Sequence, residues 1–187
     1  MTRTPFSICV YCGSRNGNDP AYLAAATALG QVIAEQGWRL VFGAGDVGMM
    51  GAVADAATSA GAATLGVIPT HLLDVEAPRR LNGDRIITET MHERKKVMFM
   101  NSDAVVVLPG GAGSLDEFFE VLTWAQIGLH KKPLFLLDVN GYWQPLVQLI
   151  DHVIARGFAG ESLKGQFRTV KTVEELTASL KFAASVG

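Results

Sequence analysis

Two short segments hold the residue types best suited to chemistry, PGGAGSLDE from Pro109 to Glu117 and TMHERKKVM from Thr90 to Met98. The first is a glycine-rich turn between an apolar run and a helical pattern. The unpaired N–H groups of such a turn, aligned with the helix dipole, favour a phosphate group. Because the segment lacks the Gly-Lys-Ser/Thr ending of an NTPase loop, it predicts a cradle for a single phosphate.

Glu117 is the carboxylate of this segment with a candidate catalytic role, but its position also allows a structural one. A positioned carboxylate can transfer a proton or stabilise positive charge in a transition state. Ser114 and Glu117 also stand at the S-x-x-E spacing of a capping box, in which the glutamate binds the start of the helix. The spacing alone leaves both interpretations open.

The second segment carries three consecutive cations, Arg94 to Lys96, just after a capping box at Thr90–Glu93. A cation near a helix N-terminus costs about 0.3–1 kcal/mol when exposed, so an anion is expected nearby. Met91, Arg94 and Met98 share one face of this helix because they are three and four residues apart. One arginine in an apolar face indicates a cation that points into a pocket, and a solvated run of charges is the alternative.

Two further glycine-rich turns follow predicted strands, CGSRNG from Cys12 to Gly17 and GAGDVG from Gly43 to Gly48. Three such turns at one sheet edge predict backbone amides gathered around an anion. The GxGxxG match in GAGDVG is only a weak indication of NAD or FAD, because it follows the second strand and the next strand ends at Pro69 without an acidic residue for the ribose. Tight helix packing is the structural alternative. Possible substrate-binding residues in these turns are Gly13, Ser14, Gly43 and Gly45.

The elements that must position these segments alternate between apolar runs and helical patterns. Strands are predicted at Phe6–Tyr11, Trp38–Phe42, Ala63–Ile68, Arg85–Thr88, Ala104–Leu108, Pro133–Asp138 and Phe167–Val170. Helices are predicted at Ala21–Gln36, Met49–Ser59, Met91–Asn101, Leu115–Leu129, Pro145–Ala155 and Val173–Ala183. Runs such as AVVVLP are apolar without alternation, which is typical of parallel strands buried on both faces. The order predicts one α/β domain over residues 1–187, a Rossmann-like doubly wound parallel sheet of about seven strands flanked by helices.

The composition limits the class of protein. The chain has 187 residues, of which 49% are hydrophobic and 18% charged, with a formal net charge of -2. These values predict a single folded domain, and the missing basic excess argues against a nucleic-acid partner. No apolar run approaches the roughly 20 residues of a membrane span. The N-terminal run FSICVYCG is more typical of a first strand than of a signal peptide. We therefore expect a cytoplasmic protein without a membrane partner. Cys9 and Cys12 are expected to be plain thiols, and no metal site is predicted.

The motifs MHERK at Met91–Lys95 and PGGAGSLDE at Pro109–Glu117 together resemble the LONELY GUY family. Further similar stretches are CGS from Cys12, GAGDVGMMG from Gly43, TWAQIGLHKKP from Thr123 and DVNGY from Asp138. Members of this family are cytokinin riboside 5'-monophosphate phosphoribohydrolases, often mislabelled as lysine decarboxylases. The resemblance implies hydrolysis of the N-glycosidic bond of a purine-type nucleoside 5'-monophosphate, which gives the free base and ribose 5-phosphate.

The resemblance also assigns roles to individual residues. Arg94 and Glu117 fall on the catalytic pair of the family. The predicted substrate-binding residues, of which Glu76 is the loosest match, are Glu76, Met91, Lys95, Gly110, Gly111, Ala112, Gly113, Ser114, Leu115, Asp116 and Thr123. The reaction requires no cofactor and no metal. The family forms homodimers, and the apolar stretch Val121–Leu129, with Trp124 and Ile127, is expected to supply a two-fold interface.

Other functions remain as alternatives. A protein of the same fold could bind a nucleotide or a phosphorylated cofactor without turnover, although the presence of both Arg94 and Glu117 argues against it. An NAD-dependent oxidoreductase would have to bind its dinucleotide at the weak GxGxxG match. A lysine decarboxylase would need a lysine that binds pyridoxal phosphate, and none stands in a suitable context. The irregular stretch Pro69–Asp84 is expected to form a lid or a dimer contact.

Overall fold

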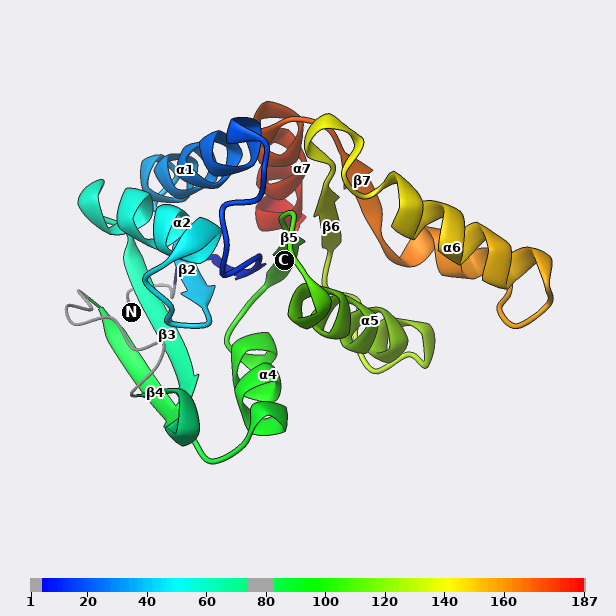
Figure 1. Ribbon diagram of the computed structural model, residues 1–187, viewed down its shortest axis with the longest axis horizontal. Helices are drawn as coiled ribbons and strands as arrows, with labels where there is room; N and C mark the ends of the chain where they lie inside the picture. Colours follow the sequence, from blue (N-terminus) through cyan, green and yellow to red (C-terminus); the bar gives the residue numbers. More distant parts are fainter. Residues whose placement is uncertain (1–4, 74–82, 187) are drawn as a thin grey trace.

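A computed structural model describes residues 5–73 and 83–186 of the chain. This part is built on one sheet of seven parallel strands in the order β4-β3-β2-β1-β5-β6-β7 (Figure 1). The strands are β1 (Ser7–Tyr11), β2 (Arg39–Phe42), β3 (Ala63–Pro69), β4 (Asp84–Thr88), β5 (Ala104–Val107), β6 (Leu134–Leu137) and β7 (Arg168–Val170). The α-helices are α1 (Pro20–Glu35), α2 (Gly48–Ser59), α4 (Met91–Met100), α5 (Ala112–Gln126), α6 (Gln144–Ala155) and α7 (Val173–Val186). Short 3-10 turns are η1 (Thr70–Leu72), η2 (Val139–Gly141) and η3 (Glu161–Gln166).

Helices cover both faces of the sheet, and the predicted doubly wound α/β class is confirmed (Figure 1). Helices α1, α2 and α7 pack on one face, where Leu29, Val53 and Leu180 belong to one hydrophobic core. Helices α4, α5 and α6 pack on the other face, where Met98 and Phe118 belong to a second core. Alternate residues of each central strand enter the two cores, which is why these strands are apolar along their whole length.

The order of the strands reverses between β1 and β5. The chain moves outward from β1 through β2 and β3 to β4, then returns to place β5 on the other side of β1. Ile8 pairs with Ala104 and Tyr11 with Val107 across this junction. In open α/β sheets a ligand binds outside the carboxyl ends of the strands at such a switch point. The turns that follow β1 and β5 therefore border the place where a ligand is expected.

Helix α5 runs from Ala112 to Gln126, whereas the sequence pattern predicts Leu115–Leu129. Gly111 is its N-cap residue, so Ser114 lies inside the first turn and not at the cap. The capping-box interpretation of Ser114 and Glu117 is therefore wrong. Glycine is a weak helix former, and the Gly-Ala-Gly-Ser run hides the true start of the helix from a propensity argument.

Two local predictions are confirmed, the capping box at the start of α4 and the unpaired thiols of Cys9 and Cys12. The Thr90 hydroxyl accepts a hydrogen bond from the Glu93 N–H, and the Glu93 carboxylate accepts one from the Thr90 N–H, which completes the capping box of α4. Cys9 and Cys12 enter opposite cores without forming a disulfide, and burial raises the pKa of both thiols. No helix within residues 5–73 and 83–186 is long and apolar enough to cross a membrane. Much of the predicted lid segment, residues 74–82, lies outside the described residues.

Candidate active site

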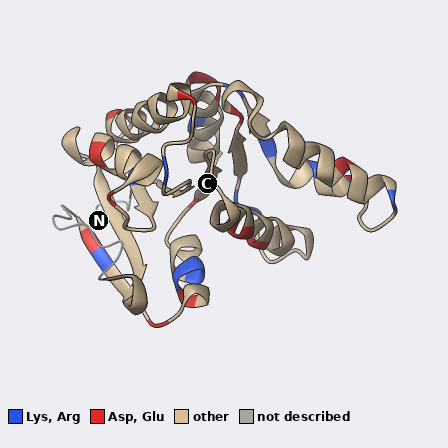
Figure 2. Cartoon of the chain, in the orientation of Figure 1, with Lys and Arg blue, Asp and Glu red and all other residues tan. Residues whose placement is uncertain are grey.

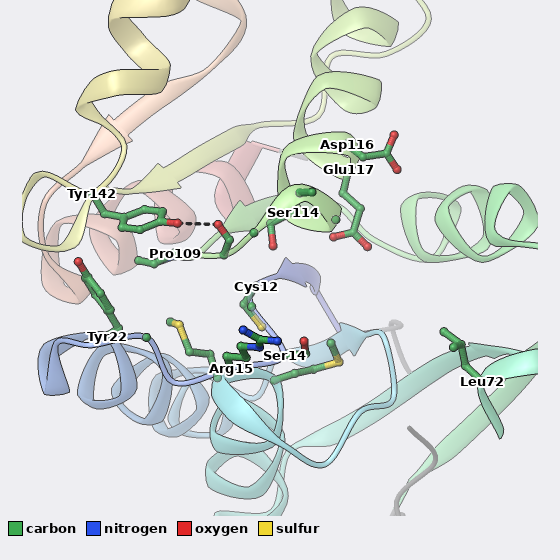
Figure 3. Close-up of a pocket in the computed structure, with 18 of the residues that line it drawn as sticks. Cys12, Ser14, Arg15, Tyr22, Leu72, Pro109, Ser114, Asp116, Glu117 and Tyr142 are labelled. Atoms are coloured by element: carbon green, nitrogen blue, oxygen red, sulfur yellow. Dashed lines mark hydrogen bonds between the residues drawn. The ribbon is translucent and has the colours of Figure 1, made fainter. Parts of the chain in front are cut away.

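A cleft of about 550 Å³ lies at the switch point of the sheet (Figure 3). The turn after β1, with Ser14 and Arg15, forms one wall, and the start of α5, with Ser114 and Glu117, forms the opposite wall. Arg94 of α4 also lines the cleft. The volume suits a small-molecule ligand. Three segments that stand far apart in the sequence thus meet at one place.

The carboxylate of Glu117 points into the cleft, whereas the side chain of Asp116 points away from it (Figure 3). Burial raises the pKa of Glu117 to about 7. The positive charge of Arg94 is the strongest opposing influence, while the carboxylates of Asp116 and Glu120 add to the rise. A carboxyl group that is desolvated in a cleft and titrates near neutral pH is typical of catalytic acids and bases.

Arg94 is only 5% exposed, and backbone atoms fix its guanidinium. Nη2 donates a 2.8 Å hydrogen bond to the carbonyl oxygen of Gly43, and Nε donates one of 3.1 Å to that of Val67. Nη1 lies 3.8 Å from the sulfur of Met91. A Cβ atom on residue 43 would overlap Nη2, so the close approach requires glycine there. Arg94 therefore presents an immobilised positive charge to the cleft.

Lys95 does not line the cleft but joins α4 to α5. Its Nζ atom lies 2.8 Å from a carboxylate oxygen of Asp116 and 3.3 Å from one of Glu120. Burial alone would lower the pKa of Lys95, but the hydrogen bonds to these two carboxylates outweigh it and the pKa is raised. Figure 2 shows the basic residues of α4 and the acidic residues near the start of α5. Among the cations of this helix start, Arg94 and Lys95 thus have partners within the protein, while Lys96 is exposed.

Hydrogen bonding and close packing join the turns after β1 and β5. The Gly13 N–H donates a 3.0 Å hydrogen bond to the carbonyl oxygen of Pro109. A Cβ atom on residue 110 would overlap the Ser114 hydroxyl and approach the backbone of Gly13, so Gly110 permits this contact. The N–H groups of residues 112–114 belong to the first turn of α5, where no intrahelical acceptor exists. These groups are available to an anion in the cleft.

One end of the cleft is aromatic, which the sequence pattern does not indicate. The Tyr142 hydroxyl donates a 2.6 Å hydrogen bond to the carbonyl oxygen of Gly110. Its ring meets the ring of Tyr22 edge to face, with the centroids 5.4 Å apart. Arg15 also lines the cleft. Only the position of these residues in the sequence could have indicated that they line the cleft. Arg15 follows β1 at the carboxyl edge of the sheet, and Tyr142 belongs to the stretch DVNGY.

The structure brings most of the predicted site residues together. Those that line the cleft are Gly13, Ser14, Met91, Arg94, Gly110, Gly111, Ala112, Gly113, Ser114, Asp116 and Glu117. Other predicted residues do not line the cleft, namely Gly43, Gly45, Lys95, Leu115 and Thr123. Glu76 lies outside the described residues. The cleft is also lined by residues that the sequence analysis does not predict as site residues, namely Cys12, Arg15, Gly17, Asn18, Tyr22, Met49, Met50, Leu72, Pro109 and Tyr142.

The stretch Val121–Leu129, expected to form a two-fold interface, is divided between core and surface. Its first residue is buried, and the ring of Trp124 packs edge-on against that of Phe99 at 5.1 Å. Ile127 and Leu129 are 64% and 69% exposed. The exposed apolar part is therefore narrower than expected and lies around the C-terminal end of α5.

Comparison with solved structures identifies proteins of the same fold. The molybdenum cofactor binding protein from Rippkaea orientalis superimposes with a TM-score of 0.72 at 23% identity, over 97% of this chain and 98% of that one. The Moco carrier protein from Chlamydomonas reinhardtii gives a TM-score of 0.72 at 24% identity, over 98% and 99% of the two chains. At these identities the likeness shows the fold alone.

Comparison with known sequences identifies the family. The family described as "Possible lysine decarboxylase" matches residues 50–180. The cytokinin riboside 5'-monophosphate phosphoribohydrolase LOG of Oryza sativa subsp. japonica is 41% identical over 174 residues, which are 93% of this chain and 72% of that protein. The cytokinin riboside 5'-monophosphate phosphoribohydrolase LOG5 of Arabidopsis thaliana is also 41% identical over 174 residues, 93% of this chain and 76% of that protein. The chain therefore belongs to the LONELY GUY family.

Proposed function

We propose that the chain hydrolyses the N-glycosidic bond of a purine-type nucleoside 5'-monophosphate, either cytokinin riboside 5'-monophosphate or AMP, to the free base and ribose 5-phosphate. The observation that carries the proposal is the position of Glu117. Its carboxylate points into the same cleft that the free N–H groups at the start of α5 border. The relative from Oryza sativa, 41% identical to this chain, is named for the same reaction.

The phosphate of the substrate would bind at the N-terminus of α5. The N–H groups of Ala112, Gly113 and Ser114 have no acceptor within the helix, and the helix dipole favours an anion there. Contacts to the phosphate are remote from the bond that breaks. They hold the ribose in place, so their binding energy can be used in the transition state.

Glu117 would lie beside the ribose. When the bond from C1' to the base nitrogen breaks, its electron pair goes to the base and positive charge develops on the ribose. Water adds its hydroxyl to C1', and its remaining proton balances the charge of the departing base. An ionised carboxylate stabilises the positive ribose, as carboxylates do in glycoside hydrolysis, and can orient or deprotonate the water. Each of these roles requires ionised Glu117.

Arg94 would act on the side of the departing base. Its guanidinium cannot swing away, because the carbonyl oxygens of Gly43 and Val67 hold it. A fixed cation stabilises the negative charge that the base gains without reorganising during the reaction. The neighbouring Met91 lines the cleft and offers an apolar surface to the ring of the base.

The lining of the cleft disfavours a decarboxylase and a dinucleotide enzyme. Within residues 5–73 and 83–186 no lysine lines the cleft, so it lacks the amine that a pyridoxal phosphate enzyme needs. The Gly43–Gly48 turn does not line it either, although a dinucleotide would have to bind there. The same described residues contain no group of three or more His, Cys, Asp or Glu side chains placed to hold a metal. A protein that binds a nucleotide without hydrolysing it remains the main alternative.

We also propose that the protein works as a cytoplasmic homodimer. The exposed side chains of Ile127 and Leu129 would leave water if two copies met around the C-terminal ends of their α5 helices. Light scattering at micromolar concentration should give about twice the 20.0 kDa mass of one chain. A particle of 20.0 kDa would contradict the dimer.

A panel of nucleoside 5'-monophosphates tests the proposed reaction. The protein is incubated with AMP, an N6-modified AMP, the other common monophosphates and the matching nucleosides, and released base is separated by chromatography. We expect free adenine or its N6-modified form, and little base from the nucleosides because they lack the phosphate. Binding of AMP without any released base would favour the binding protein. Equal turnover of adenosine and AMP would contradict the phosphate site at α5.

A further inference from the structure

A second cavity, of about 670 Å³, lies at the amino edge of the sheet, the edge opposite to the cleft. It is lined by Leu134 and Arg168, the residues at which β6 and β7 begin. Within residues 5–73 and 83–186 this cavity and the cleft share no lining residue. Its volume is large enough for a small-molecule ligand. The reaction proposed for the cleft gives this amino-edge cavity no role.

One wall of the amino-edge cavity is an apolar face of α7. Phe182 and Val186 line it from the same side of the helix, because they are four residues apart, and Ala183 lies between them. Leu180 of this helix is buried in the core instead. Phe182 and Val186 are each 70% exposed, although both side chains are large and apolar. An apolar ligand in the cavity would remove them from water.

The inner surface of the cavity is apolar and buried. Leu134 and Phe135, at the start of β6, line it and are only 2% and 5% exposed. A flat surface such as a membrane could contact Phe182 on the outside, but it could not enter to reach these two residues. A narrow apolar chain could contact both the inner residues and the wall formed by α7.

Basic side chains line the cavity, and in the described part of the chain no acidic side chain does. The basic residues are His130, Lys131, Lys132 and Arg168. The ring of His130 already has partners, since Nδ1 accepts a 3.1 Å hydrogen bond from the Lys132 N–H and Nε2 lies 2.9 Å from the carbonyl oxygen of Val121. Nζ of Lys132 donates hydrogen bonds of 2.6 Å to the carbonyl oxygens of Phe99 and Ser102. His130 and Lys132 are therefore held by the protein itself.

Lys131 and Arg168 are the uncommitted cations of this cavity. Both are exposed, and neither side chain makes a hydrogen bond or ion pair with any residue in 5–73 or 83–186. Arg168 pairs with Phe135 between β7 and β6, so both side chains lie on the face of the sheet that α7 covers. The charge of Arg168 thus lies on the same side of the sheet as the apolar wall. The lining combines free positive charge with apolar surface.

We propose that the amino-edge cavity binds an amphipathic carboxylate of the fatty-acid type. The alkyl chain lies against Phe182, Val186 and the buried start of β6, and the carboxylate binds at Lys131 and Arg168. An arginine fork matches a carboxylate, and the hydrogen bonds are assisted by charge. The basic lining disfavours a cationic ligand. It also disfavours a second copy of the chain, because a two-fold contact would bring two basic copies of this surface together.

A series of carboxylates tests the apolar part of the proposed site. Hexanoate, octanoate and decanoate are titrated into the wild-type protein by calorimetry. Burial of each added methylene group should strengthen binding by up to about fourfold, so we expect decanoate to bind about tenfold more tightly than octanoate. Decylammonium has an alkyl chain of the same length with the opposite charge. It should bind at least about tenfold more weakly than decanoate.

Substitutions of exposed residues test the location of the site. The double variant Lys131→Gln/Arg168→Gln should bind decanoate about tenfold more weakly, because it lacks both free cations. Phe182→Ala should weaken binding about threefold or more, because it removes the largest exposed side chain of the wall. Arg156→Gln and Phe158→Ala are the matched controls and should bind decanoate as wild type does. Arg156 and Phe158 are also exposed, but neither lines the cavity.

Competition separates this cavity from the cleft. An excess of ribose 5-phosphate should leave the affinity for decanoate unchanged, since the two cavities share no lining residue in the described part of the chain. Displacement of decanoate by ribose 5-phosphate would place decanoate in the cleft and overturn the inference. None of these measurements depends on the release of base from AMP, so the inference and the proposed function can fail separately.

Several other results would overturn the proposed site. They are an affinity that does not depend on chain length, equal binding of decanoate and decylammonium, and unchanged decanoate affinity in the double variant or in Phe182→Ala. Binding to vesicles of anionic lipid without any binding of decanoate would assign this surface to a membrane. A lower particle mass for Phe182→Ala than for wild type in light scattering would assign it to a contact between copies of the chain.

Discussion

Nη2 of Arg94 lies 2.8 Å from the carbonyl oxygen of Gly43, in a space that a Cβ atom on residue 43 would fill. This contact joins α4, which carries the MHERK motif, to the end of β2, where the GAGDVG turn begins. Two motifs separated by about fifty residues thus form a single structural unit. The absence of a side chain on Gly43 leaves space for the guanidinium of Arg94, which places a positive charge at the cleft.

The first prediction concerns Gly43→Ala. The added methyl group would displace the guanidinium of Arg94, so we expect a loss of about 1–3 kcal/mol in the free energy of unfolding. Activity should fall with it, because the cation moves in the cleft. Gly165→Ala is the control, since a Cβ atom there meets nothing within 4 Å. Denaturant titration of both variants measures the difference in their free energies of unfolding. Equal stability would contradict the requirement for glycine at position 43.

The second prediction concerns Arg94→Ala. A cation at an exposed helix start would destabilise the helix, and its removal would then be neutral or favourable. Arg94 is instead buried and donates to two carbonyl oxygens, which would lose their donors. We expect a loss of about 1–3 kcal/mol in stability, whereas Lys96→Ala on the exposed side of the same helix should change it by less than about 0.5 kcal/mol. An Arg94→Ala variant as stable as wild type would show that these hydrogen bonds contribute nothing.

The third prediction concerns the pH dependence of stability. The pKa of Glu117 in the folded protein is about 7, above its ordinary value of 4.5, because burial disfavours the charged form. The wild-type protein therefore loses stability as the pH rises from the ordinary value to about 7, and the loss is complete above that pH. Glutamine stays neutral, so Glu117→Gln should be more stable than wild type at pH 8, by on the order of 1–3 kcal/mol. Near pH 4 the two should be alike, and a difference independent of pH would contradict the burial of this carboxyl group.

The fourth prediction concerns the pH dependence of activity. Every proposed role of Glu117 requires the ionised carboxylate, so kcat/KM for AMP should rise with pH through about 7 and then level off. The rise should be absent from the residual activity of Glu117→Gln. Activity that instead falls as the pH rises through 7 would mean that the protonated carboxyl group donates a proton to the base.

The sheet and the position of the glycine-rich turn before α5 at the cleft could be predicted because their signals are local. Runs such as AVVVLP identify buried parallel strands on their own, and Leu134–Leu137 shows the same pattern. The sequence pattern predicts a start of α5 that is too late, because Ala112, Gly113 and Ser114 are helical in the structure despite the glycines at positions 111 and 113. Tertiary context overrides propensity at this point, as the turn packs against the backbone of Gly13.

The partners of individual side chains could not be predicted, because they depend on contacts distant in the sequence. Nothing local to Arg94 indicates that the carbonyl oxygens of Gly43 and Val67 receive its guanidinium. The aromatic end of the cleft is similar, since the rings of Tyr22 and Tyr142 are in contact although the two residues stand far apart in the sequence. Tyr22 follows β1 and Tyr142 follows β6, and the order of the strands in the sheet brings the two residues together.

The most direct measurement of the central claim is the release of free base from AMP by wild-type protein and by Glu117→Gln, with AMP binding measured in parallel by calorimetry. Wild-type protein should release adenine and ribose 5-phosphate in equal amounts. Glu117→Gln should bind AMP with similar affinity yet release base at least about 100-fold more slowly, since it keeps the phosphate site but lacks the charge that stabilises the ribose. A Glu117→Gln variant as active as wild type, or wild-type protein that binds AMP and releases no base, would contradict the claim.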